Sequence, residues 1–149
     1  MATGNRITDN ETGIVLDDAD AAVAADDNWW GCNEGLPSPD CDSIGGANVG
    51  AIDASRVLAL AIDAPSRIRP RRKRTVTASL EGGSVCLFPG GTQIRFATNK
   101  GRVRPATAET EACAASVTLK ARRRTRGNIT VSALLDNQGV EATVRVVRN

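Results

Sequence analysis

The second half of the chain alternates apolar and polar residues with a period of two, and this pattern limits the possible folds more than any other feature. Such alternation is typical of strands that turn one face to a core and the other to water. The runs are Leu58-Leu60-Ile62, Val76-Ala78-Leu80, Ile94-Phe96, Val117-Leu119, Ile129–Leu135 and Val140–Val146. They predict an antiparallel sandwich with almost no helix, and the turn Asp136–Gly139 should join the last two strands as a hairpin.

A weaker run at Gly101–Val103 completes the set of strands expected for a seven-stranded immunoglobulin-like sandwich over residues 56–149. Three segments of this half, Thr75–Leu80, Pro89–Phe96 and Gly127–Ala133, resemble the patterns of bacterial immunoglobulin-like domains of the invasin/intimin type in order and spacing. This resemblance implies a bacterial surface protein. The chain departs from the family where a basic run, Arg69–Arg74, stands in place of a Gly-rich turn.

Residues 1–55 form a different region, in which short apolar bursts recur and each is closed by Asn, Asp or Gly. Bursts this short suit single strands joined by tight turns, and Ile7, Ile14, Leu16 and Val23 should point into one core. The pattern resembles one or two coils of a right-handed parallel β-helix. We therefore expect two domains, an acidic β-helix-terminus-like segment at 1–55 and a basic sandwich at 56–149.

Between the two patterns lies the stretch from Asp27 to Cys41, which contains both tryptophans. Residues 28–35 resemble the segment NNWWGCNEG that closes parallel β-helix regions in bacterial surface proteins, although Asp27 replaces the usual first Asn. The resemblance implies that Trp29 and Trp30 cover the apolar end of the last coil. Residues 43–48 are expected to be a linker.

Four cysteines form two pairs in sequence order, Cys32 with Cys41 and Cys86 with Cys113, and they lack the spacing of a zinc site. Disulfides are the expected state, which favours an extracellular or cell-surface location. The chain contains neither an export signal nor a stretch of membrane-span length.

Catalysis is disfavoured because the chain has no histidine and no tyrosine. We expect no enzyme activity, no cofactor and no metal. An aspartate cluster offers carboxylates to calcium but lacks the EF-hand spacing and the glycine-rich nonapeptide repeat. Its members are Asp17, Asp18, Asp20, Asp26 and Asp27.

Charge is divided along the chain: residues 1–55 carry 11 acidic side chains and one basic, whereas residues 56–149 carry 6 acidic and 18 basic. The basic runs 69–74 and 122–126 contain no aromatic side chain for base stacking, so nucleic acid is not the expected partner. One or two solenoid coils cannot bury their own apolar face. Strand donation and opposite charge therefore predict self-association into a homo-oligomer or a head-to-tail, pilus-like filament.

The predicted interface combines the apolar residues of the coils with the basic turn of the sandwich. It consists of Ile7, Ile14, Leu16, Val23, Trp29, Trp30, Arg71, Arg72 and Arg74. The function favoured by the sequence is thus a non-enzymatic, extracellular structural or adhesive module. The alternative is a carbohydrate-binding or polysaccharide-processing fragment, which requires Trp29 or Trp30 to be exposed to a surface glycan.

Overall fold

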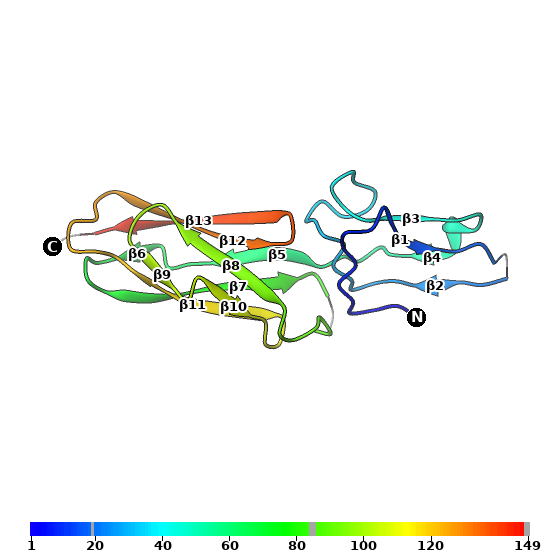
Figure 1. Ribbon diagram of the computed structural model, residues 1–149, viewed down its shortest axis with the longest axis horizontal. Coiled ribbons are helices and arrows are strands. Elements are labelled where there is room, and N and C mark those ends of the chain that lie inside the picture. Colours follow the sequence, from blue (N-terminus) through cyan, green and yellow to red (C-terminus); the bar gives the residue numbers. More distant parts are fainter. Residues whose placement is uncertain (19, 84–85, 148–149) are drawn as a thin grey trace. The chain divides into compact units, whose positions relative to one another are not determined.

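The computed structural model describes residues 1–18, 20–83 and 86–147. It divides into two compact units (Figure 1). The first comprises the described parts of Met1–Leu60, Leu80–Pro89 and Asp136–Gln138, and the second contains most of the remaining chain. The tip of the last hairpin therefore belongs to the first unit, whereas its two strands, apart from Gln138, belong to the second.

The first unit is built from parallel strand pairs. Its elements are β1 (Thr12–Val15), β2 (Val23–Ala24), β3 (Ser43–Gly45), the 3-10 helix η1 (Val49–Ala51) and β4 (Ile52–Asp53). Strand β1 pairs with β3 and strand β2 pairs with β4, both in parallel. Further parallel bridges join Arg6 to Trp29 and Asn28 to Val57.

The parallel partners are regularly spaced along the chain. Val23 lies beside Ile52, 29 residues later, and Ile14 lies beside Ile44, 30 residues later. The chain thus turns and returns to lie beside itself in the same direction on two separate ladders. β3 and β4 are edge strands, because neither sheet has a further strand within the described residues.

An apolar cluster lies within the first unit. Its buried members are Leu16, Ala25, Trp30 and Ile52. Ile7, Ile14 and Val23 pack against these residues and are partly buried. The prediction that Ile7, Ile14, Leu16 and Val23 share one core is confirmed. Residues 43–48, expected to be a linker, instead include strand β3.

The second unit is a two-layer sandwich. Its strands, apart from the end residues Ala59, Leu60, Leu80, Glu81 and Gln138 that belong to the first unit, are β5 (Ala59–Asp63), β6 (Arg67–Ile68), β7 (Lys73–Glu81), β8 (Gln93–Thr98), β9 (Arg102–Arg104), β10 (Thr107–Glu109), β11 (Ala114–Lys120), β12 (Asn128–Leu135) and β13 (Gln138–Val146). One sheet has the order β10-β8-β12-β13-β6 and the other β5-β7-β11-β9. The orders β5-β7-β11 and β8-β12-β13 correspond to strands A-B-E and C-F-G of the immunoglobulin fold.

The sandwich buries the side chains that the period-two pattern selects. Every second residue of β12 is buried, from Ile129 to Leu135, and the same holds for Val76, Ala78 and Leu80 of β7. The predicted all-β sandwich is confirmed. Strands β6 and β10, which have two and three residues, were not predicted because such short strands show no alternation. They raise the described strands of the sandwich from seven to nine.

No helix within the described residues has the length and apolar character needed to cross a membrane. The described cysteines are all disulfide-bonded. Cys32 and Cys41 pair with each other, nine residues apart, and close the Pro-rich loop after the tryptophans.

Candidate functional site

Two tryptophans and the asparagine before them form the centre of the first unit. Trp29, Trp30 and Asn28 are all fully buried. Backbone bonds fix the segment in place, because Trp29 N donates to Asn5 O at 2.9 Å and Ile7 N donates to Trp29 O at 2.8 Å. Trp29 is therefore held by a parallel bridge to Arg6, and Trp30 follows it in the chain.

Asn28 satisfies backbone groups on two neighbouring segments. Its Nδ2 donates to Ala2 O at 2.5 Å and to Ala25 O at 2.6 Å, and its Oδ1 accepts from Asn5 N at 2.8 Å. Because the amide is buried and both its donor and its acceptor are hydrogen-bonded, Asn28 stabilises the first unit. Leaving these polar groups unpaired in the core would cost folding free energy. The sequence interpretation did not single out Asn28 as a structural residue.

The two indoles differ in their polar contacts. Trp29 Nε1 donates to Asp136 Oδ2 at 2.7 Å, whereas Trp30 Nε1 is buried without a hydrogen-bond acceptor in the described residues. Arg6 forms an ion pair with the same Asp136 carboxylate. The hydrogen bond to Asp136 raises the pKa of Arg6 above its ordinary value, with a smaller opposing effect of burial.

Burial of both indoles overturns one alternative. Carbohydrate binding through Trp29 and Trp30 requires an exposed aromatic face, and each side chain has 0% exposure. Stacking on a sugar ring would need the core of the first unit to open. That part of the sequence interpretation is wrong, because both tryptophan side chains are fully buried and are not free to line a groove.

The aspartate cluster serves turns and local pairs. Asp17 Oδ1 accepts from Ala47 N at 2.9 Å, and Asp18 Oδ1 accepts from Asp20 N at 2.9 Å. Asp26 accepts from Arg56 N at 2.9 Å and pairs with the Arg56 guanidinium at 3.2 Å. Among the described residues no group of three or more acidic, His or Cys side chains is arranged to hold a metal ion.

An apolar groove of about 560 Å³ lies beside the edge strands of the first unit. Its lining comes from the Pro-rich loop, from β3 and from the segment that begins with β4: Leu36, Pro37, Ser38, Pro39, Ser43, Ile44, Ile52, Asp53, Ala54 and Ser55. The groove therefore combines apolar side chains, most of them partly buried, with two strand edges that pair with no further strand among the described residues.

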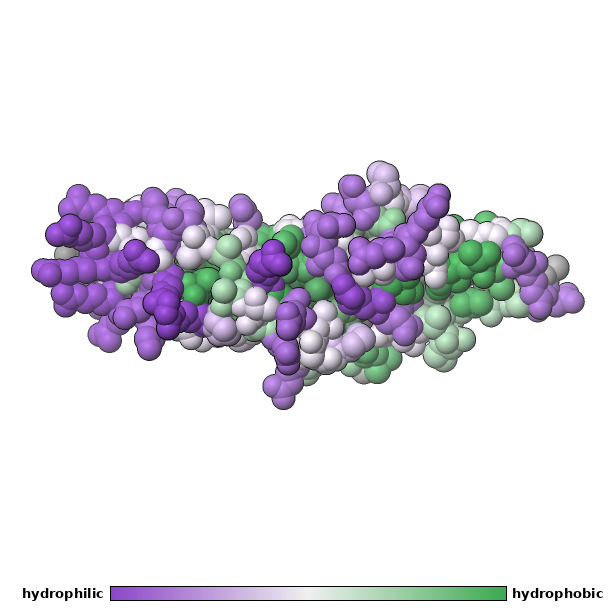
Figure 2. Space-filling view, in the orientation of Figure 1, coloured by the Kyte–Doolittle hydropathy of each residue, from purple (hydrophilic) through white to green (hydrophobic). Residues whose placement is uncertain are grey.

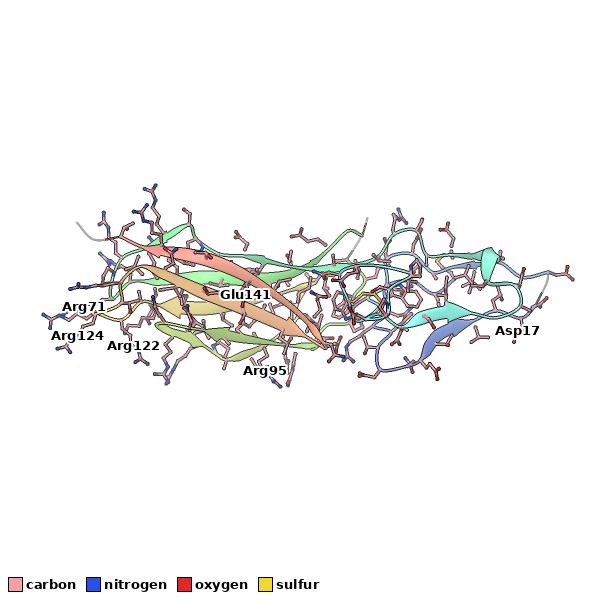
Figure 3. The ribbon with its side chains drawn as sticks, turned by 90° about the horizontal axis from the view of Figure 1, so that it is seen from above. Asp17, Arg71, Arg95, Arg122, Arg124 and Glu141 are labelled. Carbon is pink, nitrogen blue, oxygen red and sulfur yellow. A yellow bond between two sulfur atoms is a disulfide. The ribbon has the colours of Figure 1, made fainter. Side chains whose placement is uncertain are left out.

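Arginines and lysines gather at one end of the second unit. Figure 3 shows Arg71, Arg122 and Arg124 projecting outward there, from the loops that precede β7 and β12. The surface at this end is strongly hydrophilic (Figure 2). Arg71, Arg72 and Arg74 of the predicted interface are all exposed. Arg72 and Arg74 line a hollow of about 340 Å³ together with Arg67 and Arg69.

A second group of cations occupies a different hollow of the same unit, of about 320 Å³. Its lining residues are Lys73, Arg102, Arg104, Thr118 and Lys120. No local sequence pattern marks this group, because its members come from three strands and only the fold brings them together. The available signal was weak: Lys73, Arg102, Arg104 and Lys120 all lie at polar positions of alternating segments.

Comparisons with known proteins give likenesses of structure only. No family model matches the chain, and no curated protein matches it. Domains 4 and 5 of the S-layer protein SbsC match with a TM-score of 0.46 at 20% identity, over 65% of this chain and 56% of that one. The D0-D1 domain of intimin matches with a TM-score of 0.44 at 20% identity, over 60% of this chain and 45% of that one.

A C-terminal fragment of intimin, solved in complex with the intimin-binding domain of its translocated receptor, matches with a TM-score of 0.42 at 20% identity. The match covers 58% of this chain and 30% of the fragment. This chain thus spans about half or less of these three structures. With TM-scores below 0.5, these likenesses carry no argument about function.

Proposed function

We propose that the chain is a non-enzymatic module of an extracellular or cell-surface bacterial protein, in which terminal coils of a parallel β-helix precede an immunoglobulin-like domain. The observation that supports this most is the pair of parallel ladders whose partners are 29 and 30 residues apart, Val23 with Ile52 and Ile14 with Ile44. Regular parallel return of a chain onto itself is the defining geometry of a solenoid. The disulfide-bonded cysteines support an oxidising location.

The non-enzymatic part of the proposal rests on the residues that remain for chemistry. The chain has no histidine to act as a base, and the four cysteines are in disulfides, so no thiol is available as a nucleophile. A structural or adhesive role needs neither. It requires a stable unit and a surface that recognises a partner.

We also propose that the chain self-associates through its first unit. The edges of β3 and β4 beside the apolar groove pair with no further strand in the described part of the chain, and an extended segment of a second copy would pair with them and fill the groove. Opposite charge supports a second copy as the occupant, because residues 1–55 have a balance of −10 and residues 56–149 of +12. Repetition of this contact would produce a head-to-tail filament.

The mass of the protein in solution, measured by size-exclusion chromatography with light scattering at low and at high salt, tests self-association. We expect oligomers at low salt and smaller species at high salt, since exposed charges are screened beyond a few ångströms in strong salt. Asp17→Asn, Asp18→Asn and Asp20→Asn together should weaken the low-salt oligomer.

The matched control removes three exposed acidic charges from the second unit, through Asp63→Asn, Glu109→Gln and Glu141→Gln. This control should leave the oligomer unchanged or strengthen it. A strict monomer at both salt concentrations, with residues 1–26 protected from hydrogen exchange, would contradict self-association.

A further inference from the structure

The outer face of the β5-β7-β11-β9 sheet carries a row of cations across three adjacent strands. In the strand register Lys120 of β11 lies directly opposite Lys73 of β7 on one side and Arg102 of β9 on the other. Arg104 lies opposite Thr118, at the next position of the same face. All four cations are exposed, and together with Thr118 they line the hollow of about 320 Å³. We call Lys73, Arg102, Arg104 and Lys120 the cation row.

The cation row is not neutralised within the described parts of the chain. None of its four members has an acidic partner among the ion pairs there, and no acidic side chain lines the hollow. Like charges placed directly opposite each other on neighbouring strands destabilise a sheet. Two such pairs meet at Lys120, so this arrangement lowers the stability of the free sheet. A bound anion would remove the repulsion.

The rest of the same face offers hydroxyl groups. Thr75 and Thr118 lie opposite each other beside the row, and Thr77 and Ser116 follow, with their hydroxyl oxygens 2.8 Å apart. Hydroxyls that both donate and accept match the hydroxyl groups of sugars. The outward positions of β7, β9 and β11 hold no aromatic side chain, so the face has nothing on which nucleic-acid bases would stack.

We propose that the cation row binds the sulfate or phosphate ester groups of an anionic polysaccharide, with the sugar units lying along the threonine and serine hydroxyls of β7 and β11. Arg102 and Arg104 supply planar forks that bind oxyanions through two hydrogen bonds, and Lys73 and Lys120 supply point charges. The site lies in the second unit and uses neither tryptophan. It goes beyond the proposed function, because it requires no self-association.

The test compares two variants with the same net charge. The row variant carries Lys73→Gln, Arg102→Gln, Arg104→Gln and Lys120→Gln. The control variant carries Arg71→Gln, Arg122→Gln, Arg124→Gln and Arg126→Gln, which removes four cations from loops of the same unit. Binding of each full chain to heparin, to a phosphate-bearing polysaccharide and to neutral dextran is measured by titration calorimetry at fixed salt.

We expect the wild type to bind at least one of the two anionic polysaccharides and not dextran, and the heparin and phosphate arms identify the preferred ester. The row variant should lose affinity by about ten-fold or more, the effect of four exposed charge contacts, while the control should lose less than about three-fold. Lys120→Gln alone, at the centre of the row, should have the largest effect of the four single substitutions.

Stability supplies a second readout. Removing the repulsion should raise the unfolding midpoint of the row variant in the absence of ligand, so a folded and more stable protein is expected. Equal loss of affinity in the row and control variants would overturn the proposal, because net charge alone would then explain binding. The proposal would also be overturned if the wild type bound neither of the two anionic polysaccharides. The same holds if its affinity for single-stranded DNA exceeded its affinity for each polysaccharide at the same salt concentration.

Discussion

The indole Nε1 of Trp29 donates a hydrogen bond of 2.7 Å to Oδ2 of Asp136, a residue 107 positions away in the chain. Arg6 binds the same carboxylate, so one acidic side chain joins an indole and a guanidinium within the first unit. The hydrogen bond to Asp136 raises the pKa of Arg6. A raised arginine pKa contributes stability that is fully present below the ordinary value and is lost only as pH rises through the raised one, so this contribution persists at neutral pH.

The two adjacent tryptophans should respond differently to the same substitution. Trp29→Phe removes a hydrogen bond to a charged acceptor, whereas Trp30→Phe removes an indole N–H that has no acceptor in the described residues. Both lose buried ring volume, and we expect Trp29→Phe to cost about 1.5–3 kcal/mol more in unfolding free energy. Urea unfolding followed by far-UV circular dichroism measures this difference. Equal costs would show that the bond to Asp136 does not stabilise the protein.

The sequence pointed to the tryptophans but could not point to Asp136. Motif and spacing describe residues that are close in the chain, and Trp29 stands inside a recognisable segment. Asp136 was assigned to a hairpin turn, which is correct, since β12 ends at Leu135 and β13 begins at Gln138. Its second role depends on a contact across 107 residues, which no local pattern encodes.

Asn28 should be among the least replaceable polar residues of the first unit. Asn28→Asp keeps the shape of the side chain but replaces the Nδ2 donor with an oxygen that faces Ala2 O and Ala25 O. We expect a loss of about 3–5 kcal/mol, because two hydrogen bonds become repulsive contacts and a charge is buried. Tryptophan fluorescence during urea unfolding reports this unit, since both tryptophans lie in it. Asn137→Asp, at an exposed turn position, is the control and should change stability by less than about 0.5 kcal/mol.

The disulfide between Cys32 and Cys41 should contribute a modest amount to stability. Its cysteines are nine residues apart, and loop-closure entropy for so short a loop gives about 2.7 kcal/mol. We expect Cys32→Ser with Cys41→Ser to lower the unfolding free energy by about that amount while the protein stays folded. The measurement is urea unfolding monitored by tryptophan fluorescence. A variant as stable as the wild type would show that the Pro-rich loop is held by its other contacts.

The cation row shows where sequence reasoning reaches its limit. The alternation of β7 and β11 puts Lys73 and Lys120 in the polar phase of each strand, opposite the buried apolar phase. It could not predict that they lie opposite each other, because register follows from the pairing of whole strands and not from either strand alone. Only Lys73 of the row lies in a basic run of the sequence, and the other three members lie in two later segments between residues 102 and 120.

Two glycines near the edge of the first unit should differ sharply when replaced by alanine. Gly46 has a φ of +108°, and a Cβ there would collide with the Leu16 carbonyl oxygen and lie 2.6 Å from Leu16 N. Gly50, within η1, has open space at the same position. We expect Gly46→Ala to cost about 2–4 kcal/mol, from backbone strain and overpacking, and Gly50→Ala to be neutral or stabilising by up to about 1 kcal/mol.

Hydrogen exchange tells whether the damage from Gly46→Ala is local. The amides of Leu16 and Asn48, which bond to Gly45 O and Leu16 O, should exchange faster in Gly46→Ala and be unchanged in Gly50→Ala. The reason is that the new methyl group forces the turn at residues 45–48 away from Leu16. The parallel pairing of β1 with β3 depends on the contact between this turn and Leu16. If both variants kept wild-type exchange and stability, the close approach of Gly46 to Leu16 would not exist in solution.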